Sequence, residues 1–103
     1  MQLLQLFKGI VHRKRTRFIK IFEFNKRKQE EGVSFDSFLL DLRKLVKPCE
    51  YKDEDRMLKD KIVIGTNNSK LQKKLLETEK LDLTKTITIA RNFELVEIQV
   101  NDI

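Results

Sequence analysis

The residues that could perform catalysis are few, and they lie far apart in the sequence. The chain of 103 residues has one histidine, His12, and one cysteine, Cys49. They could act as base and nucleophile only if the fold brings them together. No glycine-rich loop is present to bind phosphate, and no serine lies in the turn motif of hydrolases. The carboxylates are spread among lysines, where they usually form pairs on solvated helix faces. We therefore expect no enzymatic activity and no small-molecule substrate.

The presence of only one cysteine also limits the metal and redox chemistry that the chain could perform. Because Cys49 has no second cysteine in the chain, an internal disulfide and a multi-cysteine zinc site are both excluded. Its place after Pro48 favours a small buried residue beneath a turn over a nucleophile or a metal ligand. We predict no metal and no cofactor.

Positive charge gathers at the N-terminal end of the chain. Residues 1–30 contain nine basic and two acidic side chains, whereas the other 73 residues contain thirteen basic and fourteen acidic ones. Clusters of lysine and arginine attract phosphate without sequence preference. The candidate contacts to RNA or DNA are therefore Arg13, Lys14, Arg15 and Arg17. A solvated helix start explains the same residues, and helix-turn-helix and zinc patterns are absent.

The composition indicates a single small helical domain. Apolar residues make up 40% and charged residues 37% of the chain, and three glycines and one proline are too few for the turns of a sandwich or barrel. No run of about 18 apolar residues could span a membrane, and the N-terminus lacks the basic start of a signal peptide. We expect an intracellular protein, cytoplasmic or nuclear, with no membrane partner.

The expected elements begin with a flanking helix and basic linker in residues 1–15, followed by a helical domain in residues 16–103. Thr16 is a plausible N-cap for a helix that runs to about Gln29. One side of this helix carries Phe18, Ile21, Phe22 and Asn25. Gly32 then marks a turn that needs a positive φ.

The next helix has the most regular pattern in the sequence. Ser34 is its expected N-cap, Asp36 favours the positive end of its dipole, and Pro48 ends it. Apolar residues recur with the i, i+3, i+4, i+7 spacing of one buried face. They are Phe35, Phe38, Leu39, Leu42 and the pair Leu45 and Val46.

Three further helices complete the prediction of an all-α bundle of about five helices. Asp53 or Asp55 begins one that ends at Gly65 in a left-handed conformation. Residues 67–69 cap a shorter helix with Leu71, Leu75 and Leu76 on its apolar side. Asp82 begins a long final helix, although alternating threonines make a strand the competing interpretation of residues 83–90.

The order and spacing of these motifs resemble the C-terminal capsid domain of the Gag protein of gypsy-type LTR retrotransposons. The resemblance covers about residues 16–98 and extends to Tyr51, the run 59–65 and the apolar positions of the last two helices. Its clearest part is similar to the major homology region of retroviral capsids, and the matching positions are Gln29, Gly32, Phe38 and Arg43. The acidic position of that motif is occupied by Val33. The zinc knuckle and protease of such polyproteins are missing from the chain.

The resemblance implies roles for these residues. Gln29, before the Gly32 turn, should satisfy backbone groups left open at two adjoining helix ends. Phe38 should anchor the core, and Arg43 should make a polar tie across the turn. As a whole, the resemblance implies a non-enzymatic capsid module that self-assembles into particles that package RNA. The alternatives are a basic nucleic-acid-binding domain and a co-opted dimerisation module similar to vertebrate SCAN domains.

The apolar residues exceed what one small core can bury. The expected core consists of Phe18, Phe22, Phe38, Leu42, Leu58, Ile62, Leu75, Ile87 and Phe93. The final helix carries one apolar face of Leu83, Ile87 and Ala90, and a neighbouring face of Ile89, Phe93, Val96 and Val100. We expect the second face to contact another copy of the chain, most simply about a two-fold axis.

Overall fold

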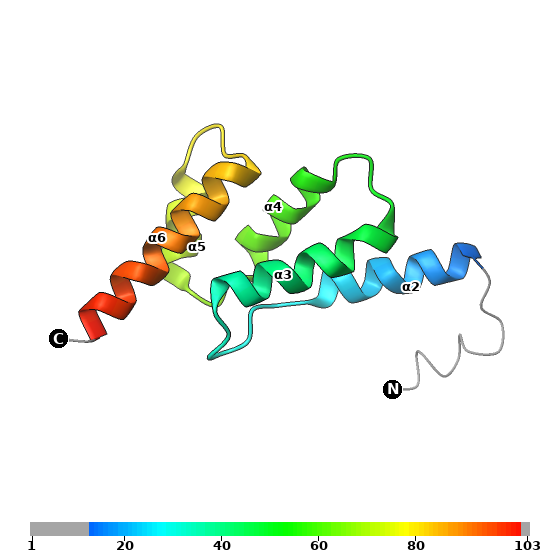
Figure 1. Cartoon of the computed structure of the whole chain (residues 1–103). Coiled ribbons are helices and arrows are strands. Elements are labelled where there is room, and N and C mark those ends of the chain that lie inside the picture. The colour runs from blue at the N-terminus through cyan, green and yellow to red at the C-terminus, as the bar shows by residue number, and fades with distance from the viewer. Residues whose placement is uncertain (1–12, 102–103) are drawn as a thin grey trace.

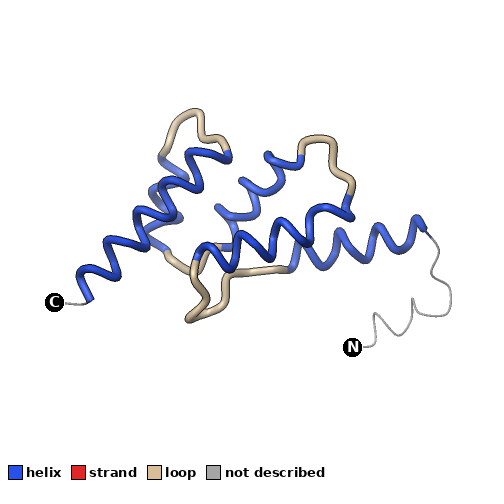
Figure 2. The backbone as a smooth tube through the Cα atoms, in the orientation of Figure 1, coloured by secondary structure: helices blue, strands red, loops and turns tan. Residues whose placement is uncertain are grey.

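The computed structural model describes the backbone of residues 13–101 and the side chains of residues 16–99. This part of the chain forms five α-helices and one short 3-10 helix without a strand (Figures 1 and 2). The elements are α2 (Arg13–Lys26), α3 (Phe35–Val46), η1 (Lys47–Cys49), α4 (Glu54–Gly65), α5 (Ser69–Glu77) and α6 (Leu83–Asn101). The all-α prediction is confirmed, and residues 83–90 are helical rather than extended. Of the flanking helix and basic linker expected in residues 1–15, residues 1–12 lie outside the described part of the chain, and residues 13–15 belong to α2.

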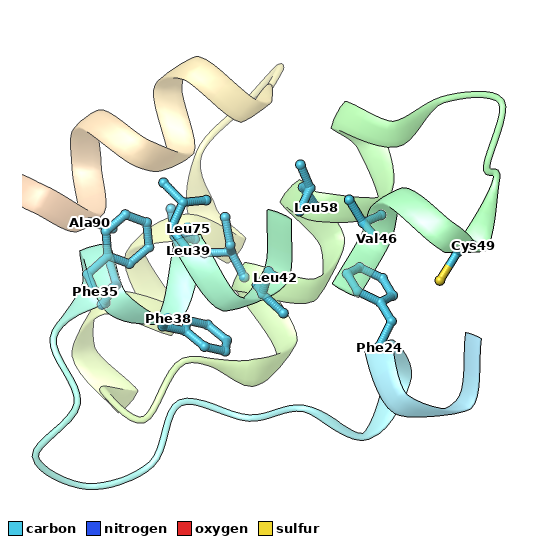
Figure 3. Close-up of a cluster of buried hydrophobic side chains, with 12 residues drawn as sticks. Phe24, Phe35, Phe38, Leu39, Leu42, Val46, Cys49, Leu58, Leu75 and Ala90 are labelled. Atoms are coloured by element: carbon cyan, nitrogen blue, oxygen red, sulfur yellow. The ribbon is translucent and has the colours of Figure 1, made fainter. Parts of the chain in front are cut away.

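Helix α3 lies at the centre of the domain and packs against α2, α4 and α6. It begins as expected at Ser34, whose Oγ accepts a hydrogen bond from the Ser37 N–H at 3.2 Å. Its apolar stripe faces inward (Figure 3), with Phe35, Phe38, Leu39, Leu42 and Val46 buried. The N-cap and the apolar stripe expected from the sequence therefore both match the position of α3 in the fold.

Helix α2 differs from the prediction in both its limits and its buried face. It begins at Arg13, three residues before the expected N-cap Thr16, and ends at Lys26. Phe18 and Phe22 are 64% and 48% exposed, so their assignment to the core is wrong. Only one side of α2 is covered, by α3 and η1, and there the buried residue is Phe24. Figure 3 shows its ring directed from α2 toward Val46 of α3.

The other three helices begin at capping residues that the sequence indicates. The side chains of Asp53, Asn68 and Asp82 accept hydrogen bonds from backbone N–H groups in the first turns of α4, α5 and α6. Each satisfies a donor that the helix itself leaves open. On α5 the expected apolar side is only partly buried, because Leu76 is exposed beside the buried Leu75.

Gly65 ends α4 for a reason other than the expected left-handed conformation. The only glycine with a positive φ in the described residues is Gly32, at 82°, as predicted for its turn. At Gly65 an added Cβ would lie 3.0 Å from Cζ of Phe38 and 3.4 Å from the carbonyl oxygen of Arg27. Glycine is needed here because α3 and the segment after α2 approach the end of α4 closely.

The domain is elongated, with a longest extent of 54 Å. The first turns of α2 and the last turns of α6 project at opposite ends of the molecule (Figure 1). No helix in the described part of the chain is both long and apolar enough to cross a membrane.

Candidate functional site

Gln29 joins the turn after α2 to the end of α4. Its side chain is buried, and its Nε2 donates to the carbonyl oxygen of Val33 at 2.8 Å. Its Oε1 accepts from the hydroxyl of Thr66 at 3.2 Å and from the N–H of Asn67 at 3.4 Å. Its backbone N–H donates to the carbonyl oxygen of Gly65 at 2.8 Å. One residue therefore fixes the turn and supports the C-terminal end of a helix, the contact expected from its place before Gly32.

The other motif residues divide between core and surface. Phe38 is buried, with its ring tip against Gly65. Arg43 is exposed and forms no hydrogen bond or ion pair with the described residues, so its predicted polar tie is wrong. The basic residues that contact α3 are instead Arg91, whose Nε donates to Oδ1 of Asp36 at 2.9 Å, and Arg27, whose Nη1 lies 4.0 Å from Oδ2 of Asp41. Arg43 points outward because its helix position lies between the buried ones.

Helix α6 supplies carboxylates that sequence reasoning missed. Glu94 accepts a hydrogen bond from the N–H of Phe35, the first residue of α3, at 2.8 Å. Glu97 accepts one from Nδ2 of Asn68, the N-cap of α5, at 2.8 Å. Together with Gln29, these side chains line a hollow of about 80 Å³. The i,i+3 spacing of the two glutamates was the only signal in the sequence, and it does not indicate which helix ends they reach.

The basic side chains of α2 have different partners. The Nε of Arg17 donates to the carbonyl oxygen of Cys49 at 2.9 Å and lies 3.8 Å from Oε1 of Glu50. Arg17 therefore joins α2 to η1. Arg13, Lys14 and Arg15 form the first turn of α2, and their side chains lie outside the described ones. A second cationic group, Lys26, Arg27 and Lys28, lines a surface hollow of about 360 Å³ with Glu23, Glu30 and Leu45.

The thiol of Cys49 and the ammonium of Lys61 are buried, and each donates a hydrogen bond to a backbone carbonyl. The thiol of Cys49 donates to the carbonyl oxygen of Leu45 at 3.3 Å, and burial raises its pKa despite the nearby charge of Arg17. The ammonium of Lys61 donates to the carbonyl oxygen of Asn25 near the end of α2. Burial lowers the pKa of Lys61, and the charge of Lys28 acts in the same direction. The burial expected for Cys49 is confirmed, whereas His12 lies outside the described residues.

The apolar face predicted for self-association is divided. Ile89 and Phe93 are partly buried and pack against the core, as do Leu83 and Ile87 of the neighbouring face. Val96 is exposed, and the side chain of Val100 lies outside the described ones. Both faces of α6 are thus used within the domain as far as Phe93. Among the described side chains of its last turns, the exposed apolar ones are Leu95, Val96 and Ile98.

No protein-family model, curated protein or solved structure matches the chain. The resemblance to retrotransposon capsids therefore rests on the residues and spacing given above. Among the described side chains, no group of three or more histidine, cysteine or acidic residues could hold a metal ion.

We expect Gln29→Leu to lower the free energy of unfolding by about 1–3 kcal/mol, because it leaves the partly buried carbonyl of Val33 and the N–H of Asn67 without their partner. Gln99 is exposed on α6 and forms no hydrogen bond with the described residues. Gln99→Leu is therefore the matched control and should change stability by less than about 0.5 kcal/mol. Chemical denaturation followed by circular dichroism measures both. Equal stabilities for the two variants would contradict the role assigned to Gln29.

Proposed function

We propose that this chain is a non-enzymatic assembly module of the retrotransposon Gag capsid type, which functions by binding copies of itself. The observation that carries the proposal is large apolar side chains exposed at both projecting ends of the domain. Phe18 and Phe22 lie four residues apart on α2, and Leu95 and Ile98 lie three apart on α6. Exposed apolar residues that share a helix face are typical of interaction surfaces, whereas isolated ones are ordinary.

The motif around Gln29 supports the capsid type in particular. Its glutamine, glycine turn and buried phenylalanine hold together α3, α4 and the segment after α2. That architectural role is what the resemblance implies for the major homology region. Particle formation, with RNA packaged inside, is the function that such a module would serve.

A non-enzymatic role is supported by the state of the candidate nucleophile. The thiol of Cys49 is fully buried and donates to a backbone carbonyl, and burial raises its pKa. Nucleophilic cysteines need the opposite environment, with an accessible thiolate of lowered pKa.

A second candidate function is binding to RNA or DNA through α2 and the residues that follow it. The hollow lined by Lys26, Arg27 and Lys28 favours it, because these cations are exposed around one depression of the surface. Such binding would be electrostatic, and its affinity would fall steeply with salt concentration.

Sedimentation velocity of the purified chain with and without RNA tests the two candidates. Self-association without RNA is the expected result, because the exposed apolar residues need no bridging ligand. Association that appears only with RNA and disappears at high salt would favour the second candidate. A monomer under both conditions would contradict the assembly proposal.

A further inference from the structure

The two projecting ends of the domain carry opposite charge. Helix α2, residues 13–26, contains six basic side chains and one acidic one, and its first turn has no acidic residue. Residues 92–101 contain two acidic side chains and no basic one, and the last turn of α6 has no basic residue. Because a helix dipole is positive at its N-terminus and negative at its C-terminus, both dipoles reinforce these charges.

Each charged end also exposes apolar side chains. We call the exposed pair Phe18 and Phe22 on the cationic helix α2 the basic end. We call Leu95, Val96 and Ile98, with the carboxylates of Glu94 and Glu97, the acidic end. All five apolar side chains are between 48% and 64% exposed. The two ends lie at opposite extremes of the 54 Å long axis (Figure 1), so one copy cannot bring its own two ends together.

We propose that the basic end of one copy docks on the acidic end of a second copy, head to tail. This inference rests on the proposed self-assembly and assigns its interface. A contact of two basic ends would bring the cationic helix α2 of one copy against that of another, and like charges that face each other across an interface are costly. The head-to-tail contact instead pairs an apolar, cationic surface with an apolar, anionic one. Glu97 retains lone pairs for such a contact, because it is exposed and accepts one hydrogen bond, from Asn68.

This geometry changes the expected symmetry of the assembly. A contact between two different surfaces leaves one free basic end and one free acidic end on every dimer. It therefore produces a ring or an open chain of copies rather than the closed two-fold dimer expected from the sequence.

Two single-end variants test the arrangement. Phe18→Glu blocks the basic end and Leu95→Lys blocks the acidic end, and both replaced side chains are exposed, so the fold should be retained. Each variant alone should associate at least about 30-fold more weakly than the natural chain, the effect typical of a central interface residue. Mixed in equal amounts, they should form a 1:1 dimer that does not grow, through the intact acidic end of one and the intact basic end of the other.

The matched control is Ile64→Lys on α4, where Ile64 is 69% exposed and belongs to neither end. This variant should associate like the natural chain. The head-to-tail contact is overturned if the natural chain associates and the two variants do not form a dimer when mixed. It is also overturned if Phe18→Glu destabilises the monomer without weakening association, because residues of the same chain would then cover Phe18. A natural chain that stays monomeric would instead contradict the proposed function itself.

Discussion

Phe38→Ala is expected to lower the free energy of unfolding by about 3–5 kcal/mol, the usual cost of removing an aromatic side chain from a packed core. Phe38 is 1% exposed in the first turn of α3, and its ring tip lies against Gly65 of α4. The loss should be large because both elements are fixed by other contacts and cannot close the cavity. Thermal or denaturant unfolding followed by circular dichroism measures it.

Leu40→Ala is the control for this variant, because Leu40 lies on the same helix and is 53% exposed. It should cost less than about 0.5 kcal/mol, as surface substitutions usually do. A loss below about 1 kcal/mol for Phe38→Ala would mean that the ring is not part of the core.

Gly65→Val should be the second most damaging change, with a loss of about 3 kcal/mol, near the upper end of the range for overpacking. The first added carbon already lies 3.0 Å from the Phe38 ring and 3.4 Å from the Arg27 carbonyl oxygen. The branched side chain would therefore push α3 and the segment after α2 away from α4. The same unfolding experiment detects the loss.

A double-mutant cycle separates this steric clash from a general effect on α4. In the Phe38→Ala background, Gly65→Val should lower the free energy of unfolding clearly less, because the ring with which the valine side chain clashes is absent. If the losses in the free energy of unfolding are strictly additive, residues 38 and 65 do not contact each other.

The helices that the sequence predicted best are those in which local signals coincide. Around α3, the cap at Ser34, the apolar stripe and the stop at Pro48 all specify the same helix. Along α2, by contrast, Phe24 lies on a different face from Phe18 and Phe22, and helical spacing alone favoured the i,i+4 pair. Which side is buried depends on how α3 and η1 lie against the helix, and that is set by contacts distant in the sequence.

In the candidate site, too, the contacts that could not be predicted are those between residues distant in the sequence. The importance of Gln29 followed from its position before the Gly32 turn, but its partners Thr66 and Asn67 are 37 and 38 residues away. The contact between Glu94 and the start of α3 spans 59 residues. Gly65 was expected to be left-handed because glycine commonly ends helices that way. The close approach of Phe38, which a sequence pattern does not show, is the actual requirement.

Sedimentation equilibrium over a concentration series is the experiment that bears most closely on the proposal that the domain binds copies of itself. We expect the average mass to rise above that of a monomer in the micromolar range, which corresponds to a binding free energy of roughly −8 kcal/mol. Contacts in a lattice are individually weak because many of them act together. A chain that remains a monomer up to millimolar concentration would show that the domain does not function by binding copies of itself.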